Sequence, residues 1–137
     1  MREGAARDDF VRMIEVVKGR AVASGMPRGL QVNMADSSLS MVKINEMGSI
    51  EVEFDPLTGG DRIIYLSAIY SGVSINSMTN GDGVSGSGII WFDFESNPHT
   101  RESNGDFSSL NVEAAEVTLS SNERVIVYPY SGTLEVQ

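Results

Sequence analysis

Hydrophobic and polar residues follow one period before Pro27 and another after it. In the first part, hydrophobic residues recur at steps of three and four, which places them on one face of a helix. They are Phe10, Met13, Ile14, Val17 and Ala21, and Ala6 shares their arc. The spacing predicts an amphipathic helix over about 6–24, which Gly25 and Pro27 end. We expect the five residues from Phe10 to Ala21 to fasten this helix to a sheet.

The predicted helix carries a second, weaker cluster on another side, formed by Arg12, Val16, Gly19 and Ala23. A glycine inside a helix costs about 1 kcal/mol relative to alanine, so Gly19 needs an explanation. Two interpretations stay open. The cluster is either an exposed and slightly weakened helix surface, or a subunit contact at which another backbone approaches.

After Pro27 the period becomes two, which is typical of half-buried strands. Nine short strands are predicted, at Leu30–Met34, Val42–Ile44, Ile50–Phe54, Ile63–Leu66, Val73–Met78, Ile89–Phe94, Glu116–Leu119, Arg124–Tyr128 and Thr133–Val136. Turn residues such as Asp55-Pro56 and Gly59-Gly60 separate most of them, and short turns connect antiparallel strands. The stretches Thr79–Gly88 and Glu95–Asn111 are expected to be longer loops. The predicted fold class is α+β, with one N-terminal amphipathic helix packed on antiparallel β-sheets.

The 137 residues are expected to form a single globular domain, with the β region at about 29–137. The net charge of −9 disfavours general binding to nucleic acid or to an anionic membrane, because both need a basic surface. Residues 1–28 carry six Lys or Arg against four Asp or Glu, and residues 29–137 carry four against fifteen. This uneven charge indicates that the helix and the β region face different electrostatic surroundings, or at least tolerate them. The chain has no cysteine, which excludes disulfides and thiolate metal sites.

Residues that usually build an active site are sparse. His99 is the single histidine and is expected to be an exposed loop residue, and no G-x-S-x-G motif accompanies it. Two carboxylate pairs, Glu51 with Glu53 and Asp93 with Glu95, share strand faces. A glycosidase places two carboxyls across a cleft, but a solvated sheet face explains these pairs without chemistry. No catalytic residue, cofactor or metal site is therefore predicted.

Three further patterns have a structural explanation. The run Gly81-Asp-Gly-Val-Ser-Gly86 matches the dinucleotide motif G-x-G-x-x-G by letter, but no helix is expected after it, so a hairpin connection is favoured. Asn80 and Asp82 carry oxygens that hard cations prefer, yet the distal Glu of an EF-hand is missing, and a solvated turn is favoured. Trp91 with the tyrosines resembles a sugar-binding platform, but its apolar strand favours the core.

The residues around the end of the helix and in the last strands carry a resemblance. The passage Lys18-Gly-Arg-Ala-Val-Ala-Ser-Gly-Met-Pro-Arg-Gly-Leu-Gln-Val32 resembles the helix-to-strand passage of the GspH/FimT family of minor pseudopilins and minor type IV pilins. So does the pattern Trp91-Phe-Asp-Phe94, a loop, Arg124-Val-Ile-Val127 and Ser131-Gly-Thr-Leu-Glu-Val136. The resemblance implies a structural subunit of a type II secretion pseudopilus or type IV pilus. Its partners would be other pilins or pseudopilins, and secreted protein cargo.

Members of this family have a longer helix, whose first half is an apolar segment that anchors the precursor in the inner membrane. No stretch of this sequence approaches the roughly 20 apolar residues that cross a bilayer. The prepilin peptidase site and the early Glu of the apolar segment are also missing. The resemblance therefore implies an anchor encoded upstream and places this domain in the periplasm, with a membrane contact only through the missing segment.

The alternative function is a free-standing β-rich module that binds a glycan or a protein, with Trp91 and the tyrosines as its platform. Burial of Trp91 would count against this alternative. A DNA-binding minor pilin of the FimT kind needs a basic patch, and only four basic residues follow Arg28. A small hydrolase is the least supported function.

Overall fold

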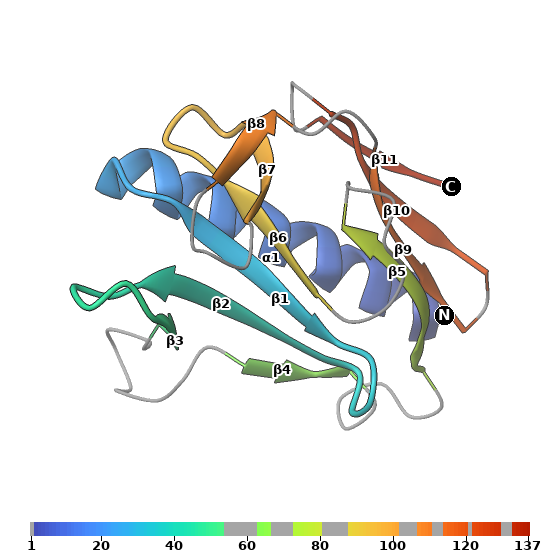
Figure 1. The fold of residues 1–137 in the computed structure, drawn as a ribbon. Helices are drawn as coiled ribbons and strands as arrows, with labels where there is room; N and C mark the ends of the chain where they lie inside the picture. Colours follow the sequence, from blue (N-terminus) through green and yellow to red (C-terminus); the bar gives the residue numbers. More distant parts are fainter. Residues whose placement is uncertain are drawn as a thin grey trace.

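In the computed structural model, one long helix lies across two antiparallel sheets (Figure 1). The structure describes residues 2–53, 63–66, 73–80, 88–101, 107–110, 114–120, 122–129 and 133–137. Helix α1 spans Arg2–Ser24, so it begins four residues before the predicted start at Ala6 and ends where predicted. Gly25 closes it, with a φ of +68° and an amide that donates to the carbonyl of Ala21 at 3.0 Å.

The larger sheet has seven strands among the described residues, in the order β3-β2-β1-β6-β7-β8 with β4 also paired to β2. Their bounds are Arg28–Asn33 for β1, Ser38–Ile44 for β2, Ile50–Val52 for β3, Ile63–Tyr65 for β4, Gly88–Phe92 for β6, Pro98–Arg101 for β7 and Phe107–Leu110 for β8. The smaller sheet has the order β11-β10-β9-β5. It consists of β5 at Ile75–Asn80, β9 at Ala115–Leu119, β10 at Arg124–Val127 and β11 at Leu134–Val136.

The predicted α+β class is confirmed, and a strand occurs at each of the nine predicted places. The prediction of one long loop over 95–111 is wrong, because β7 and β8 lie within it. Their sequences, Pro-His-Thr-Arg and Phe-Ser-Ser-Leu, lack the alternation that marks a half-buried strand. They are strands because their backbones pair at one edge of the larger sheet. The other predicted loop contains the end of β5 and the start of β6, while residues 81–87 and Phe54 lie outside the described residues.

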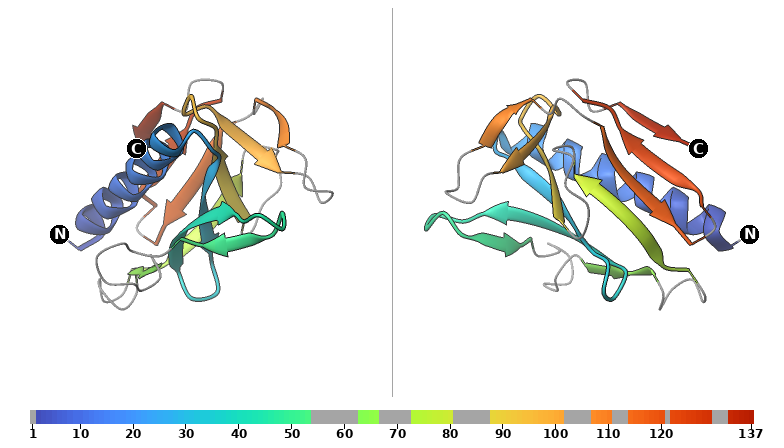
Figure 2. Two further views of the ribbon diagram at one scale, coloured as in Figure 1. Left: turned by 90° about the vertical axis from the view of Figure 1, so that its left-hand side faces the viewer. Right: turned by 45° about the vertical axis from the view of Figure 1, so that its right-hand side comes forward.

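The core lies between α1 and the two sheets, and α1 contacts β1 and β6 of one sheet and β10 of the other. Figure 2 shows the helix along one side of the molecule, with both sheets on its other side. All five residues of the predicted inner face are buried, with exposures between 0 and 7%. They pack in one cluster with sheet residues that include Leu30, Met41, Ile90, Val117 and Val125.

Strand register divides the larger sheet into two faces. Leu30 of β1 lies opposite Met41 and Ile90, and its neighbour Gly29 lies opposite Val42 and Trp91. Because successive side chains point to opposite faces, the first set faces α1 and the second set points away from it. A Cβ on Gly29 would lie 2.9 Å from Cε3 of Trp91 and 2.6 Å from Cγ2 of Ile89. Gly29 therefore allows the Trp91 ring to lie against the backbone of β1.

Candidate functional site

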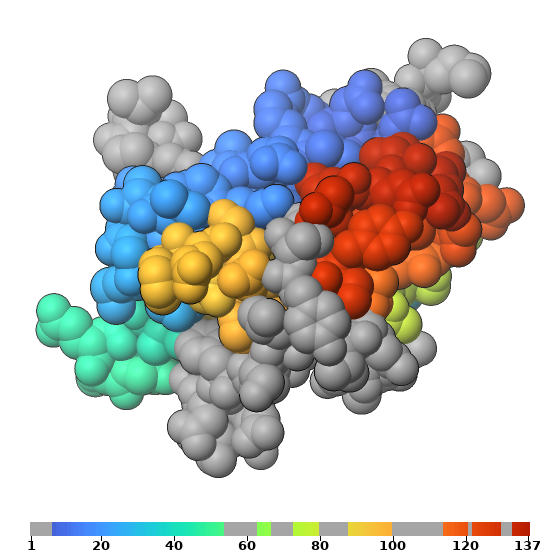
Figure 3. Space-filling model, turned by 90° about the horizontal axis from the view of Figure 1, so that it is seen from above, coloured from blue at the N-terminus to red at the C-terminus, as the bar shows by residue number. Residues whose placement is uncertain are grey.

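The outer face of α1, formed by Arg12, Val16, Gly19 and Ala23, is exposed along its length. The Arg12 side chain is 73% exposed and forms an ion pair with Asp9 one turn earlier, and Val16 is 40% exposed. A Cβ built on Gly19 would meet no atom within 4 Å. No packing within the described molecule therefore requires glycine at this position. Figure 3 shows α1 in blue at one border of the molecule, beside the red and orange atoms of the smaller sheet.

Three arginines within residues 1–28 form ion pairs with acidic residues of the β region. Arg7 Nη1 lies 3.0 Å from Oε2 of Glu123, in the turn between β9 and β10. Arg20 Nε lies 3.0 Å from Oε1 of Glu53, and Arg28 Nε lies 3.5 Å from the same oxygen. The uneven charge is thus used inside the molecule, where it holds α1 to both sheets. These pairs engage two of the fifteen acidic residues of the β region, so the expectation of different electrostatic surroundings stays a prediction.

Glu53 is the acceptor that joins the helix to the larger sheet. It is only 5% exposed, so the prediction that it lies on a solvated sheet face is wrong. Glu51 shares its strand phase but is 40% exposed in its side chain, and pairs with Lys43 at 3.5 Å. The two carboxylates differ because Glu53 follows the end of β3, where Arg20 and Arg28 cover it. In the part of the chain that the structure describes, Oε2 of Glu53 accepts no hydrogen bond.

The β6–β7 hairpin is built around the carboxylate of Asp93. Its Oδ1 accepts hydrogen bonds from the amides of Glu95 and Asn97, each at 2.9 Å, and its Oδ2 lies 2.7 Å from Nε2 of His99. Partial burial alone would raise the pKa of Asp93, but the hydrogen bonds from Asn97, His99 and Glu95 outweigh it and lower this pKa. Ser96, with a φ of +67°, completes the turn.

His99 is therefore not the exposed loop residue that was predicted. It lies on β7 opposite Trp91, and its side chain is 15% exposed. The sequence did contain a signal for this hairpin. Asp at the start of a turn commonly binds the amides two and four residues on, and Asn-Pro favours a turn. The run Asp93-Phe-Glu-Ser-Asn-Pro98 has both features directly after an apolar strand.

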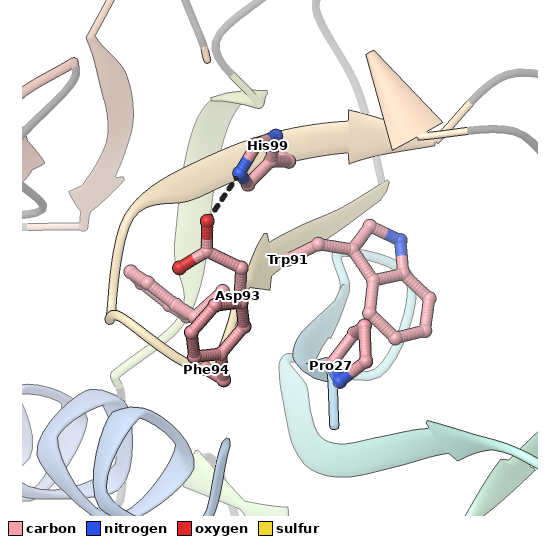
Figure 4. A pocket seen from close by; sticks show the side chains of 6 residues that line it. Pro27, Trp91, Asp93, Phe94 and His99 are labelled. Carbon is pink, nitrogen blue, oxygen red and sulfur yellow. Dashed lines mark hydrogen bonds and ion pairs between the residues drawn. The ribbon is translucent and has the colours of Figure 1, made fainter. Parts of the chain in front are cut away.

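A cavity of about 250 Å³ lies beside this hairpin (Figure 4). Its lining is almost entirely apolar and comes from Pro27, Trp91, Phe92 and Phe94, with Asp93 and His99. Trp91 is 2% exposed, which confirms that it is buried and counts against the sugar-binding platform. Among the tyrosines, Tyr65 of β4 and Tyr128, directly after β10, are partly exposed, and Tyr70 and Tyr130 lie outside the described residues.

The possible cation loop and the G-x-G-x-x-G run lie outside the described residues, apart from the backbone of Asn80. Within the described ranges, no group of three or more His, Cys, Asp or Glu side chains is placed to hold a metal ion. No helix in the same ranges is long and apolar enough to cross a membrane.

Two solved structures of the minor pseudopilin EpsH, from the type 2 secretion system of Vibrio cholerae, have this fold. One matches with a TM-score of 0.67 and 11% sequence identity, covering 99% of this chain and 95% of EpsH. The other matches with a TM-score of 0.59 and 15% identity, covering 96% of this chain and 90% of EpsH. No protein-family model and no curated protein sequence matches the chain. The predicted pseudopilin-like fold is thus confirmed, and at this identity the likeness concerns the fold.

Proposed function

We propose that this chain is a non-enzymatic subunit of a type II secretion pseudopilus, which acts by assembly with other pilin-like subunits. The fold likeness to EpsH supports the class of protein. The observation that carries the proposal is the contrast between the two faces of α1. One face is buried in the core, and the outer face presents Gly19 and Ala23 to solvent, with open space where a side chain on Gly19 would lie.

Arg12, Val16, Gly19 and Ala23 are the proposed contact with a neighbouring subunit. The distance between two packed helices depends on the side chains at the contact, and glycine with alanine permits the shortest approach. The ion pairs Arg7–Glu123 and Arg20–Glu53 fix α1 against the sheets before assembly. A contact surface that is already ordered loses less conformational entropy on binding. The outer face is therefore suited to repeated packing with neighbouring subunits.

The proposal includes a location. An apolar segment ahead of α1 would anchor the subunit in the inner membrane, and the described domain would lie in the periplasm, within a fibre. The sheets and hairpins would then face other subunits or secreted cargo. This part is tested by the codons upstream of Met1, which should encode a short basic leader, a peptidase site and roughly 20 apolar residues. An upstream region without them would contradict it.

The contact is tested in cells that make the full-length protein and secrete through the system. The double substitution Gly19→Glu and Ala23→Glu should abolish fibre assembly and secretion, because it places two bulky charges on the outer face. Ala35→Glu is the matched control, since Ala35 is exposed in the turn between β1 and β2 and lies outside the proposed contact. Normal assembly and secretion by the double variant, at an unchanged protein level, would refute the contact.

A further inference from the structure

The cavity beside the β6–β7 hairpin lies apart from the outer face of α1. Trp91 and His99 are opposite each other in register, on the face of the larger sheet that points away from the helix. Figure 4 shows their side chains near Pro27, Asp93 and Phe94. Phe94 lines the cavity and is 56% exposed. Because a wall residue is so exposed, the cavity reaches the protein surface.

The size and lining of the cavity indicate which group would fit in it. A dry cavity of about 150 Å³ holds benzene, so one of about 250 Å³ accommodates the side chain of phenylalanine or leucine. The exposed apolar part of its wall is the Phe94 ring with Pro27, whereas Trp91 is 2% exposed and the Phe92 side chain belongs to the core under the helix. Such surface favours another ring, packed edge to face or offset. It offers little to a sugar, because the polar groups of the lining are confined to Asp93 and His99.

The acidic residues next to Phe94 indicate which residues a partner would carry beside the apolar side chain. Phe94 lies between Asp93 and Glu95 in sequence, and Glu95 is exposed. The carboxylate of Asp93 is held by two backbone amides and by His99, and the lowered pKa keeps it ionised at neutral pH. One carboxylate, that of Asp93, thus lies in the cavity wall, and Glu95 adds a second, exposed one next to Phe94 in the chain. Because opposite charges attract across an interface, these acidic groups favour a partner with basic residues and disfavour an acidic partner.

We propose that this cavity binds an apolar side chain, preferably aromatic, that a partner protein presents next to basic residues. The apolar side chain enters between Phe94 and Pro27, and the flanking lysine or arginine lies over Asp93 and Glu95. This site does not depend on the outer face of α1 or on fibre assembly. The proposal gives the β6–β7 hairpin a role in recognition. Strand β7 of this hairpin was not predicted from the sequence pattern.

The test uses three capped tripeptides, Lys-Phe-Lys, Glu-Phe-Glu and Lys-Ala-Lys, titrated into the 137-residue chain. Trp91 is the only tryptophan and lines the cavity, so its emission reports occupancy. Lys-Phe-Lys should change this emission saturably, with a Kd about tenfold lower than that of Glu-Phe-Glu. The reason is that the two lysines attract Asp93 and Glu95, whereas the two glutamates of the other peptide are repelled by them. Lys-Ala-Lys should cause no saturable change. Glucose, tested as a sugar probe, should also cause none.

Variants separate the ring from the charge. Phe94→Ala should weaken Lys-Phe-Lys binding about tenfold, and Glu95→Gln should reduce the preference for Lys-Phe-Lys over Glu-Phe-Glu. Tyr128→Ala removes a partly exposed aromatic residue outside the cavity and should change neither value. The proposal would be overturned by equal affinity for Lys-Phe-Lys and Glu-Phe-Glu, by no saturable response to Lys-Phe-Lys, or by a saturable response to glucose.

Discussion

The two faces of α1 differ in almost every physical respect. Its inner face is entirely apolar and buried against both sheets, whereas its outer face combines Arg12, Val16, Gly19 and Ala23 and stays in solvent. The inner face accounts for the position of the helix in this molecule, and the outer face contributes nothing to it. These small side chains are exposed in the described part of the chain, and the proposed subunit contact rests on that exposure.

Charge separates the same two regions. The arginines at the borders of the helix, Arg7 and Arg20, reach Glu123 and Glu53 of the β region. Arg12, on the outer face, forms an ion pair with Asp9 of its own helix. Two acidic residues of the β region thus hold the helix in place, while the Arg12 side chain remains 73% exposed. A neighbour that packs on the outer face meets mostly small and apolar groups.

The largest expected effect is on the inner face. Phe10→Ala should lower the free energy of unfolding by about 4 kcal/mol, because it opens a cavity where a fully buried ring was. Val16→Ala on the outer face should change it by less than about 0.5 kcal/mol. Chemical denaturation followed by circular dichroism measures both. Similar losses for the two variants would contradict the contrast between the faces.

The next effect concerns the ion pairs at the helix border. Glu53→Gln should lower the free energy of unfolding by about 3 kcal/mol, because it leaves Arg28, which is 8% exposed, without its anion. Glu51→Gln, two residues earlier in β3, is the matched control. Its partner Lys43 is partly exposed, so the loss should stay below about 1 kcal/mol. Equal losses from the two substitutions would show that Glu53 does not hold the helix.

The smallest effect depends on pH and should involve the hairpin but not the helix. The folded state lowers the pKa of Asp93, so its ionised form contributes stability above the unfolded value of about 3.9 and loses it as the pH falls through the folded value. Asp93→Asn should cost about 1 kcal/mol at pH 7. This difference should shrink steadily below about pH 4. The cost of Phe10→Ala should not change over the same range, and a pH-independent cost of Asp93→Asn would contradict the assignment.

The sequence was sufficient for the parts of the fold that rest on hydrophobic periodicity. The five residues at helical spacing predicted which side of α1 would be covered, and Gly25 with Pro27 predicted where the helix ends. Alternation of apolar and polar residues, and the nearly continuous apolar runs at Ile63–Leu66 and Ile89–Phe94, predicted nine of the strands.

The sequence was insufficient where the structure depends on backbone pairing between strands or on a contact with a residue far away in the sequence. Strand β7 exists because of backbone hydrogen bonds at a sheet edge, which leave no apolar pattern, and His99 was consequently placed in a loop. Glu53 has the same alternation as Glu51, and its burial depends on Arg20, which is 33 residues away. The cavity beside Trp91 forms where Pro27 lies next to the β6–β7 hairpin. The spacing of residues in the sequence does not predict this contact.

The most direct test of the outer face as a subunit contact is photo-crosslinking in cells that make the full-length protein. A photoreactive benzoyl-phenylalanine replaces Val16, which is 40% exposed on the outer face, and in a second strain it replaces Met47, which is 83% exposed on the β2–β3 hairpin. Val16 should give an adduct with another pilin-like subunit, identified by mass spectrometry. If the probe at Val16 captures no such subunit while the probe at Met47 does, the outer face of α1 is not the contact.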